Sequence, residues 1–291
     1  MPRYCWLGDK LVPERSAKVS VLDRGLLLGE GLFETMRAYN GKVFALGRHY
    51  KRMKAGARVL EIPLPPLRYV EDAIAKLLAA NRLSEARVRL TMTSGPGGPG
   101  LLPTGPTSPT MIILAHPLDA LPDRLYRKGA RAVILPIRKS TGSTLTGIKT
   151  TSYVENIIGR RMAKKAGVDE GIFLNSEGDL CEGAASNIFL VKYSDLYTPD
   201  TGSGCLPGIT REIVLELAPK AGLTPQERAL SPIDLVDAEE AFITSSTREL
   251  IPLVEVDGDE IGEGRPGSKT ARLHQIYREM VERYCPSPRR E

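Results

Sequence analysis

A sixteen-residue stretch from Ser94 to Pro109 contains five glycines and five prolines. Proline lacks the N–H that helices and central strands need, and glycine weakens both, so this stretch can form neither. It is either an ordinary surface loop or a loop that covers a site, since long loops in compact domains are often functional. In both cases it separates two apolar strands, which we expect at 88–92 and 110–115.

The apolar patterns on the two sides of this loop do not alternate regularly between strand and helix. We expect helices at 46–60, 67–81, 154–166, 209–221 and 266–284. Further strands are expected at 4–7, 10–12, 32–39, 42–45, 130–137, 170–174, 185–191, 239–244 and 252–256. Such an order favours an α+β fold and not a doubly wound parallel sheet.

A domain boundary is expected near residues 116–123, which contain two prolines and no apolar periodicity. This gives an N-terminal subdomain at 1–116, an interdomain loop at 117–129 and a C-terminal subdomain at 130–291. The length of 291 residues suffices for two domains of ordinary size, and the 42% apolar content is that of a globular protein.

Composition excludes several classes of function. The net charge of +5 is dispersed, whereas nucleic-acid binding needs a concentrated basic stripe. The four cysteines form no CxxC pair and share no spacing with the three histidines, so we expect no metal site. Neither a signal peptide nor an apolar run of about 18 residues is present, so we expect no membrane span and a cytoplasmic location.

Lys149 lies in an unusual setting, Gly147-Ile148-Lys149-Thr150-Thr151-Ser152-Tyr153. A lysine in a loop is by default a solvated charge. This lysine, however, stands among hydroxyl residues and directly before an apolar helix pattern. A lysine that forms a Schiff base must approach an aldehyde as a neutral amine, which needs local desolvation.

Glu182 stands ahead of the apolar run that includes Asn187-Ile188-Phe189. It is either a surface glutamate at a strand end or a carboxylate placed against a pyridine nitrogen. A carboxylate there keeps the nitrogen protonated, so that the ring accepts electrons from a carbanion. A lysine and a carboxylate of this kind together indicate pyridoxal 5'-phosphate (PLP) chemistry.

Three further segments offer contacts for a phosphate group. Gly208-Ile209-Thr210 opens a helix pattern, whose free N–H groups attract anions, although the same residues also make an ordinary N-cap. Ser245 and Ser246 belong to a run of four hydroxyl residues that ends a strand. Arg52 adds a cation.

The chain resembles the fold type IV PLP-dependent enzymes, which include branched-chain aminotransferases, D-amino acid aminotransferases, (R)-amine transaminases and aminodeoxychorismate lyases. The resemblance covers nearly the whole chain. The motifs that carry it are 21–25, 29–37, His49-x-x-Arg52-Met53, Ile148-Lys149, Glu182-Gly183 with 187–189, 208–211 and 252–258. It implies a two-subdomain fold with a smaller N-terminal α/β subdomain and a larger, β-rich C-terminal PLP-binding subdomain, and a homodimer.

The resemblance also implies the role of each site residue. Lys149 is the Schiff-base lysine and moves the proton, and Glu182 pairs with the pyridine nitrogen. The phosphate is held by Arg52, Ile209, Thr210 and Ser246, with Ser245 close by, and Tyr153 lies near the phenolic oxygen of the cofactor.

Two stretches, 16–63 and 254–269, resemble branched-chain aminotransferases most closely, whereas the motif at 182–187 looks closer to D-amino acid aminotransferases. Phe33, Thr35 and Arg89 are the expected substrate residues, and Arg89 stands where the branched-chain enzymes often have an arginine for the substrate carboxylate; it is otherwise an exposed strand residue. Two departures are Thr35, where these enzymes usually have glycine, and Leu28, where they usually have tyrosine. The loop at 94–109 lacks the Arg-x-His trap of D-amino acid aminotransferases, and Pro99 stands where the lyases have arginine.

The expected function is therefore a PLP-dependent transaminase. It moves an amino group from a branched-chain-like amino acid or an amine to a 2-oxo acid such as 2-oxoglutarate or pyruvate, by a ping-pong route. The alternatives are an aminodeoxychorismate lyase that releases pyruvate and a transaminase selective for D-amino acids or (R)-amines.

Overall fold

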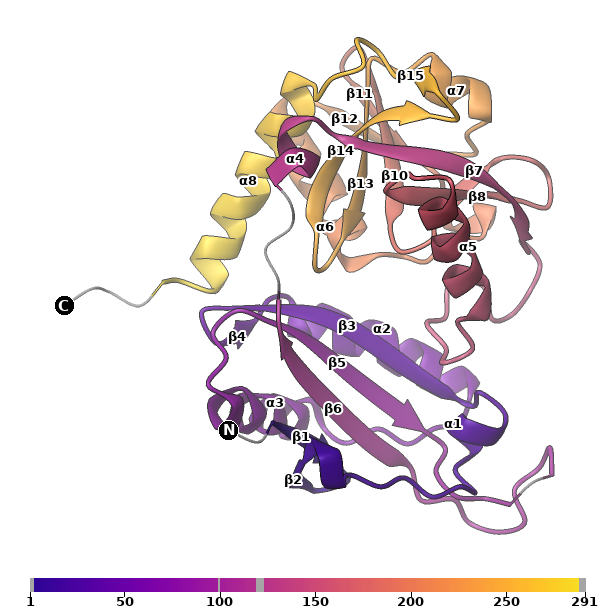
Figure 1. Cartoon of the computed structure of the whole chain (residues 1–291), viewed down its shortest axis with the longest axis vertical. Helices are drawn as coiled ribbons and strands as arrows, with labels where there is room; N and C mark the ends of the chain where they lie inside the picture. The colour runs from indigo at the N-terminus through magenta and orange to yellow at the C-terminus, as the bar shows by residue number, and fades with distance from the viewer. Residues whose placement is uncertain (1–2, 99, 119–122, 288–291) are drawn as a thin grey trace. The chain divides into compact units, whose positions relative to one another are not determined.

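The computed structural model describes residues 3–98, 100–118 and 123–287. The chain divides into two compact units (Figure 1). Unit 1 comprises Met1–Asp119, Ile148–Ser152 and Val281–Glu291, and unit 2 comprises Ala120–Gly147 and Tyr153–Met280. The short segment that carries Lys149 thus belongs to unit 1, whereas the sequence led us to expect it in the C-terminal subdomain.

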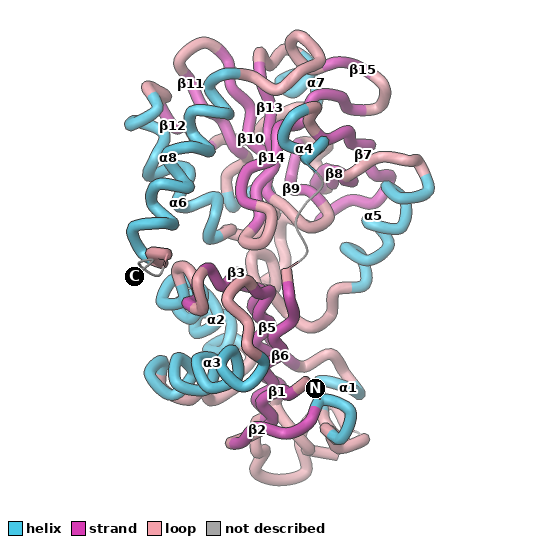
Figure 2. Tube along the Cα trace, turned by 60° about the vertical axis from the view of Figure 1, so that its left-hand side comes forward, coloured by secondary structure: helices cyan, strands magenta, loops and turns pink. Residues whose placement is uncertain are grey.

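Unit 1 is built on an antiparallel sheet, whose described strands follow the order β2-β1-β6-β5-β3-β4. The strands are β1 (Tyr4–Leu7), β2 (Lys10–Pro13), β3 (Gly31–Tyr39), β4 (Lys42–Val43), β5 (Ala86–Thr93) and β6 (Thr110–Pro117). Helices α2 (Leu46–Val59) and α3 (Leu67–Asn81) lie side by side on one face of this sheet (Figures 1 and 2). Alternate residues of β3, namely Leu32, Met36 and Ala38, belong to the core beneath them, as the period of two requires.

The segment 148–152 joins unit 1 because it runs beside β3. The N–H of Phe33 donates to the carbonyl of Lys149 over 3.0 Å, and the N–H of Thr151 donates to the carbonyl of Gly31 over 2.9 Å. The side chain of Ile148 packs against the core under the helices. These contacts, between residues more than 110 positions apart, fix the main chain on both sides of Lys149.

The glycine- and proline-rich segment 94–109 forms no regular helix or strand among its described residues. Its two ends are joined by the buried carboxylate of Asp23, which accepts hydrogen bonds from the hydroxyls of Thr93 (2.9 Å) and Thr110 (2.8 Å). Arg24, in the short helix α1 (Arg24–Leu27), donates to the carbonyls of residues 100 and 101. Pro99, which stands where the aminodeoxychorismate lyases have arginine, lies outside the residues that the structure describes.

Unit 2 contains a mixed sheet of nine described strands, in the order β12-β11-β10-β13-β14-β7-β8-β9, with β15 paired to β14. The strands are β7 (Ala130–Lys139), β8 (Glu170–Asn175), β9 (Leu180–Gly183), β10 (Asn187–Lys192), β11 (Asp195–Thr198), β12 (Thr224–Glu227), β13 (Glu240–Ser245), β14 (Glu249–Val256) and β15 (Asp259–Glu260). The helices are α4 (Asp123–Arg127), α5 (Val154–Lys165), α6 (Ile209–Leu217), α7 (Pro232–Val236) and α8 (Ser268–Tyr284), and the last of these continues into unit 1.

Both faces of β8 are buried. Phe173 packs on the side of α5, in a small core with Leu135 and Ala184, whereas Ile172 and Leu174 belong to a larger core on the opposite face. A strand buried on both faces reads as a continuous apolar run, and this explains the sequence Gly171-Ile172-Phe173-Leu174.

The α+β class expected from the sequence is confirmed. The helix expected at 209–221 ends at Leu217 and continues as a 3-10 turn, because Pro219 lacks the N–H that a further helical turn needs. Glu182, expected ahead of a strand, lies within β9. The expected interdomain loop at 117–129 contains α4, and its residues 119–122 lie outside the described part of the chain.

Candidate functional site

The residues expected at the site are divided between the two units. Unit 1 contains Phe33, Thr35, Arg52, Arg89 and Lys149. Unit 2 contains Tyr153, Glu182, Ile209, Thr210, Ser245 and Ser246.

In unit 1, the ring of Phe33 brings two cationic side chains together. The amine of Lys149 lies 4.6 Å from the centroid of this ring, and the guanidinium carbon of Arg89 lies 3.7 Å from it. Thr35 pairs with Arg89 across β3 and β5, so both side chains share the sheet face of Phe33. Three expected substrate residues and the expected catalytic lysine thus occupy one face of one sheet.

On the opposite face of β3, the buried carboxylate of Glu34 holds Arg52. Oε1 of Glu34 accepts a hydrogen bond from Nε of Arg52 over 2.8 Å, and Oε2 accepts from Nη2 over 2.5 Å. Nδ1 of His49 lies 2.7 Å from the same Oε2. This fork-shaped pairing fixes the plane of the guanidinium. Glu34 and His49 both belong to the motifs found in the sequence, but their role in orienting Arg52 was not predicted.

The pKa values of Glu34 and His49 both differ from their ordinary values. Burial alone would raise the pKa of the Glu34 carboxyl, but the charge of Arg52 and the hydrogen bonds from His49 and Arg52 lower it from 4.5 to about 2. Burial lowers the pKa of His49 from its ordinary 6.5, against the opposing effect of Glu34. At neutral pH His49 is therefore uncharged, and its Nδ1–H donates to the Glu34 carboxylate.

In unit 2, the peptide group of Leu206 joins the segment of Glu182 to the start of α6. One oxygen of Glu182 accepts the N–H of Leu206 over 3.0 Å, and the side-chain amide of Asn187 donates to the Leu206 carbonyl over 2.8 Å. A Cβ on Gly208 would lie 1.9 Å from the amide oxygen of Asn187, so only glycine fits there. The sequence analysis included Asn187 in a motif, but it did not predict that the side-chain amide holds the Leu206 carbonyl.

The start of α6 suits a phosphate group. Gly208 occupies the N-cap and gives no side-chain hydrogen bond, so the helix itself supplies N–H groups from buried Ile209 and Thr210. Within the described residues, the buried hydroxyl of Thr244, next to Ser245, has no hydrogen-bond partner. Uncapped helical N–H groups and an unsatisfied hydroxyl match the donors that a phosphate needs.

The model of the family Amino-transferase class IV matches residues 31–256. The chain belongs to this family. The branched-chain-amino-acid aminotransferase of Escherichia coli (strain K12) is 31% identical to it over 282 residues, which cover 94% of this chain and 91% of that protein.

Solved structures agree with this assignment. The crystal structure of an Escherichia coli branched-chain amino acid aminotransferase matches with a TM-score of 0.91 at 30% identity, over 96% of this chain and 95% of that one. The branched-chain amino acid aminotransferase of T.th., solved with pyridoxamine 5'-phosphate, matches with a TM-score of 0.91 at 29% identity, over 98% of this chain and 96% of that one.

The protein is therefore a fold type IV aminotransferase that acts on an amino acid and a 2-oxo acid, and its cofactor is PLP, as in the class IV aminotransferases generally. No group of three or more potential metal ligands occurs among the residues that the structure describes. No described helix has the length and apolar character to cross a membrane.

Proposed function

We propose that this aminotransferase moves the amino group of a branched-chain amino acid to a 2-oxo acid, with Lys149 as its catalytic residue. The observation that carries the proposal is the position of Lys149 and Arg89 over the ring of Phe33. The ring offers an apolar wall for an aliphatic side chain, and Arg89 offers a partner for the substrate carboxylate. The names of the relatives above support the same substrate class.

We further propose which residues bind PLP. The start of α6, with Ile209 and Thr210, binds its phosphate together with Ser246 and Arg52, and Ser245 lies close by. Glu182 pairs with the ring nitrogen, and Tyr153 lies near the phenolic oxygen. The uncapped start of α6 and the buried Thr244 hydroxyl support this assignment, because both can donate hydrogen bonds to an anionic partner.

When bound, PLP supplies the aldehyde that exchanges for an amino group and a ring that stabilises negative charge at the substrate Cα. The chain supplies the remaining parts. Lys149 carries the proton to and from that carbon, and its main chain is held against β3. Glu182 keeps a positive charge on the ring nitrogen favourable. Glu34 fixes Arg52 in the orientation that contacts phosphate.

The quaternary structure is proposed to be a homodimer. Unit 1 exposes large apolar side chains in two segments that Arg24 joins: Val21 and Leu26 are 74% and 66% exposed, and Leu101 and Leu102 are 85% and 81% exposed. Exposed apolar side chains gathered in this way are typical of a protein interface. All four cysteines are free and buried, which agrees with the cytoplasmic location that we propose.

The test is to mix the holoenzyme with 2-oxoglutarate and, separately, L-leucine, D-alanine and (R)-1-phenylethylamine, and to measure glutamate formed. We expect L-leucine to be the best donor. Lys149→Ala should abolish turnover, while Lys128→Ala, at an exposed lysine, should not. A faster reaction with D-alanine or the amine would contradict the donor assignment, and repeated pyruvate release from aminodeoxychorismate without an acceptor would indicate a lyase.

A further inference from the structure

Unit 2 contains a cavity of about 710 Å³ along helix α5. Its walls come from α4, from α5, from the turn at 167–169, from Ala184 and Ala185, and from Arg248. Of the residues that we assign to the cofactor, only Tyr153 reaches its lining. The volume falls within the range of roughly 300–1,000 Å³ that is typical of small-molecule sites.

The lining of this cavity is strongly basic. Five lining residues are cationic and one is acidic; the cations are Arg124, Arg160, Arg161, Lys164 and Arg248, and the acid is Asp169. The chain as a whole is close to charge balance, with 40 basic and 35 acidic residues. The cavity therefore concentrates positive charge, and concave sites of one sign attract small ions of the other.

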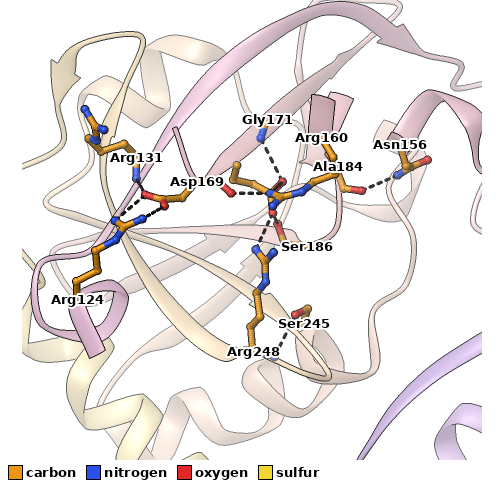
Figure 3. Close-up of polar contacts among 11 residues, drawn as sticks. Arg124, Arg131, Asn156, Arg160, Asp169, Gly171, Ala184, Ser186, Ser245 and Arg248 are labelled. Atoms are coloured by element: carbon orange, nitrogen blue, oxygen red, sulfur yellow. Dashed lines mark hydrogen bonds and ion pairs between the residues drawn. The ribbon is translucent and has the colours of Figure 1, made fainter. Parts of the chain in front are cut away.

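Two of these arginines share a single carboxylate (Figure 3). Glu170 is fully buried; one of its oxygens lies 3.0 Å from Nη1 of Arg160, and the other lies 3.4 Å from Nη1 of Arg248. The hydroxyl of Ser186 also donates to Glu170, over 3.2 Å. Burial lowers the pKa of Arg248, Glu170 opposes this effect, and repulsion from Arg160 adds to it. One negative charge thus serves two guanidinium groups.

The acidic lining residue is already neutralised. Asp169 pairs with the guanidinium of Arg124 and accepts the main-chain N–H of Arg131 over 3.0 Å (Figure 3). Although burial opposes ionisation, these hydrogen bonds lower the pKa of Asp169. Arg161 and Lys164 lie on the exposed side of α5, and neither has an ion-pair partner within the described part of the chain. The surplus of positive charge is therefore available to a ligand.

We propose that this cavity binds a small organic anion, with an oxyanion head on the basic residues and an apolar body against Leu125, Ile157 and Val168. These three side chains line the same cavity and give it an apolar wall. The oxyanion head is a carboxylate or a phosphate, since guanidinium groups bind both in a fork geometry.

The site lies next to two segments that we assign to the cofactor. The main-chain N–H of Arg248 donates to the hydroxyl of Ser245 over 3.3 Å, and Ser186 closes the turn that follows Glu182. A ligand on Arg160 and Arg248 would therefore contact the network that supports both segments, without occupying the cofactor site itself.

Titration calorimetry on the holoenzyme at low salt tests the proposal, with phenyl phosphate and hexanoate as separate probes. The double variant Arg161→Gln/Lys164→Gln removes two exposed cations of the lining, and Lys165→Gln is the matched control, because Lys165 is exposed on α5 but does not line the cavity. We expect at least one probe to bind the wild type, with about ten-fold weaker binding in the double variant. Transamination should stay unchanged in all variants.

Binding of phenyl phosphate alone would identify a phosphate-headed ligand, binding of hexanoate alone a carboxylate-headed one, and both outcomes support the proposal. It is overturned if neither probe binds saturably, or if the double variant binds as tightly as Lys165→Gln. If hexanoate binds only at the catalytic site, its affinity will be the same in the double variant and in Lys165→Gln. This result also overturns the proposal.

Discussion

Replacing Glu34 by glutamine should destabilise unit 1 while preserving its shape. Glutamine has nearly the same size, but it carries no charge and cannot accept two hydrogen bonds from Arg52 and one from His49 on two equivalent oxygens. The guanidinium of Arg52, whose side chain is 12% exposed, then loses its carboxylate partner. A charge that stays buried without a partner is costly.

The magnitude follows from the pKa of Glu34. A fall from 4.5 to about 2 corresponds to about 3 kcal/mol in favour of the ionised folded form. Removal of one partner from a buried ion pair typically costs about 3–5 kcal/mol, which agrees. With a urea dependence of about 2 kcal/mol per molar, the unfolding midpoint should fall by about 1.5 M.

The assay is urea unfolding followed by tryptophan fluorescence. Trp6 is the single tryptophan of the chain and is buried in the core of unit 1, so its emission reports on this unit. Glu71→Gln is the matched control, because Glu71 is exposed on α3 in the same unit. Its midpoint should match that of the wild type.

The difference between the wild type and Glu34→Gln should depend on pH. The folded pKa of Glu34 lies below its unfolded value, so its stabilisation is complete above about pH 4.5 and is lost as the pH falls toward 2. At about pH 3.5 roughly half should remain. A midpoint equal to that of Glu71→Gln, or a difference that persists undiminished at low pH, would refute the reasoning.

Three further predictions concern other parts of the chain. Gly95→Ala should destabilise unit 1 by more than about 2 kcal/mol in the same urea assay, because Gly95 has φ +76° and a Cβ there would lie 1.7 Å from the carbonyl oxygen of Ser108; Gly105→Ala, with open space around it, should not. Because burial raises the pKa of all four cysteine thiols, Ellman's reagent should find no fast-reacting thiol in the native protein and four after denaturation. Glu182→Gln should lower kcat on the order of 100-fold, whereas Glu177→Gln, at an exposed glutamate, should leave steady-state kinetics unchanged.

Local patterns were sufficient to predict most elements of this fold. The helices at 46–60, 67–81 and 154–166 are confirmed within one residue at each end, because apolar spacing and proline or glycine punctuation act locally. The short elements α1, α7, β11 and β12 were missed, since four or five residues do not carry a measurable period. The order of strands could not be predicted, because pairings such as β1 with β6 join residues about 105 positions apart.

The candidate site could be predicted only in part, for the same reason. The residue types at Lys149 and Glu182 indicated their chemistry, but their supports are remote in sequence. Lys149 is held by β3, more than 110 residues earlier, and Glu182 is held by Leu206, 24 residues later. Spacing along the chain contains no signal for either contact.

One further signal in the sequence is a glutamate inside an apolar strand or at its first residue. Glu34 lies inside the apolar strand β3, and Glu170 and Glu249 are the first residues of the apolar strands β8 and β14; all three are buried. A buried carboxylate needs a cationic or hydrogen-bonding partner. Each one has such a partner on another segment: Glu34 holds Arg52, Glu170 lies between two arginines, and Glu249 lies 2.7 Å from His274 of α8.

These carboxylates therefore mark the points where segments remote in sequence meet. Glu34 lies beneath the proposed phosphate arginine, and Glu170 lies beneath the basic cavity, so two of the three support a proposed anion site from behind. The physical reason is general: an arginine that must present part of its guanidinium to an anion is best oriented by a carboxylate on its other side. A buried glutamate in or at the start of an apolar strand of a similar chain would thus predict a remote basic partner, and that partner is a candidate for an anion site.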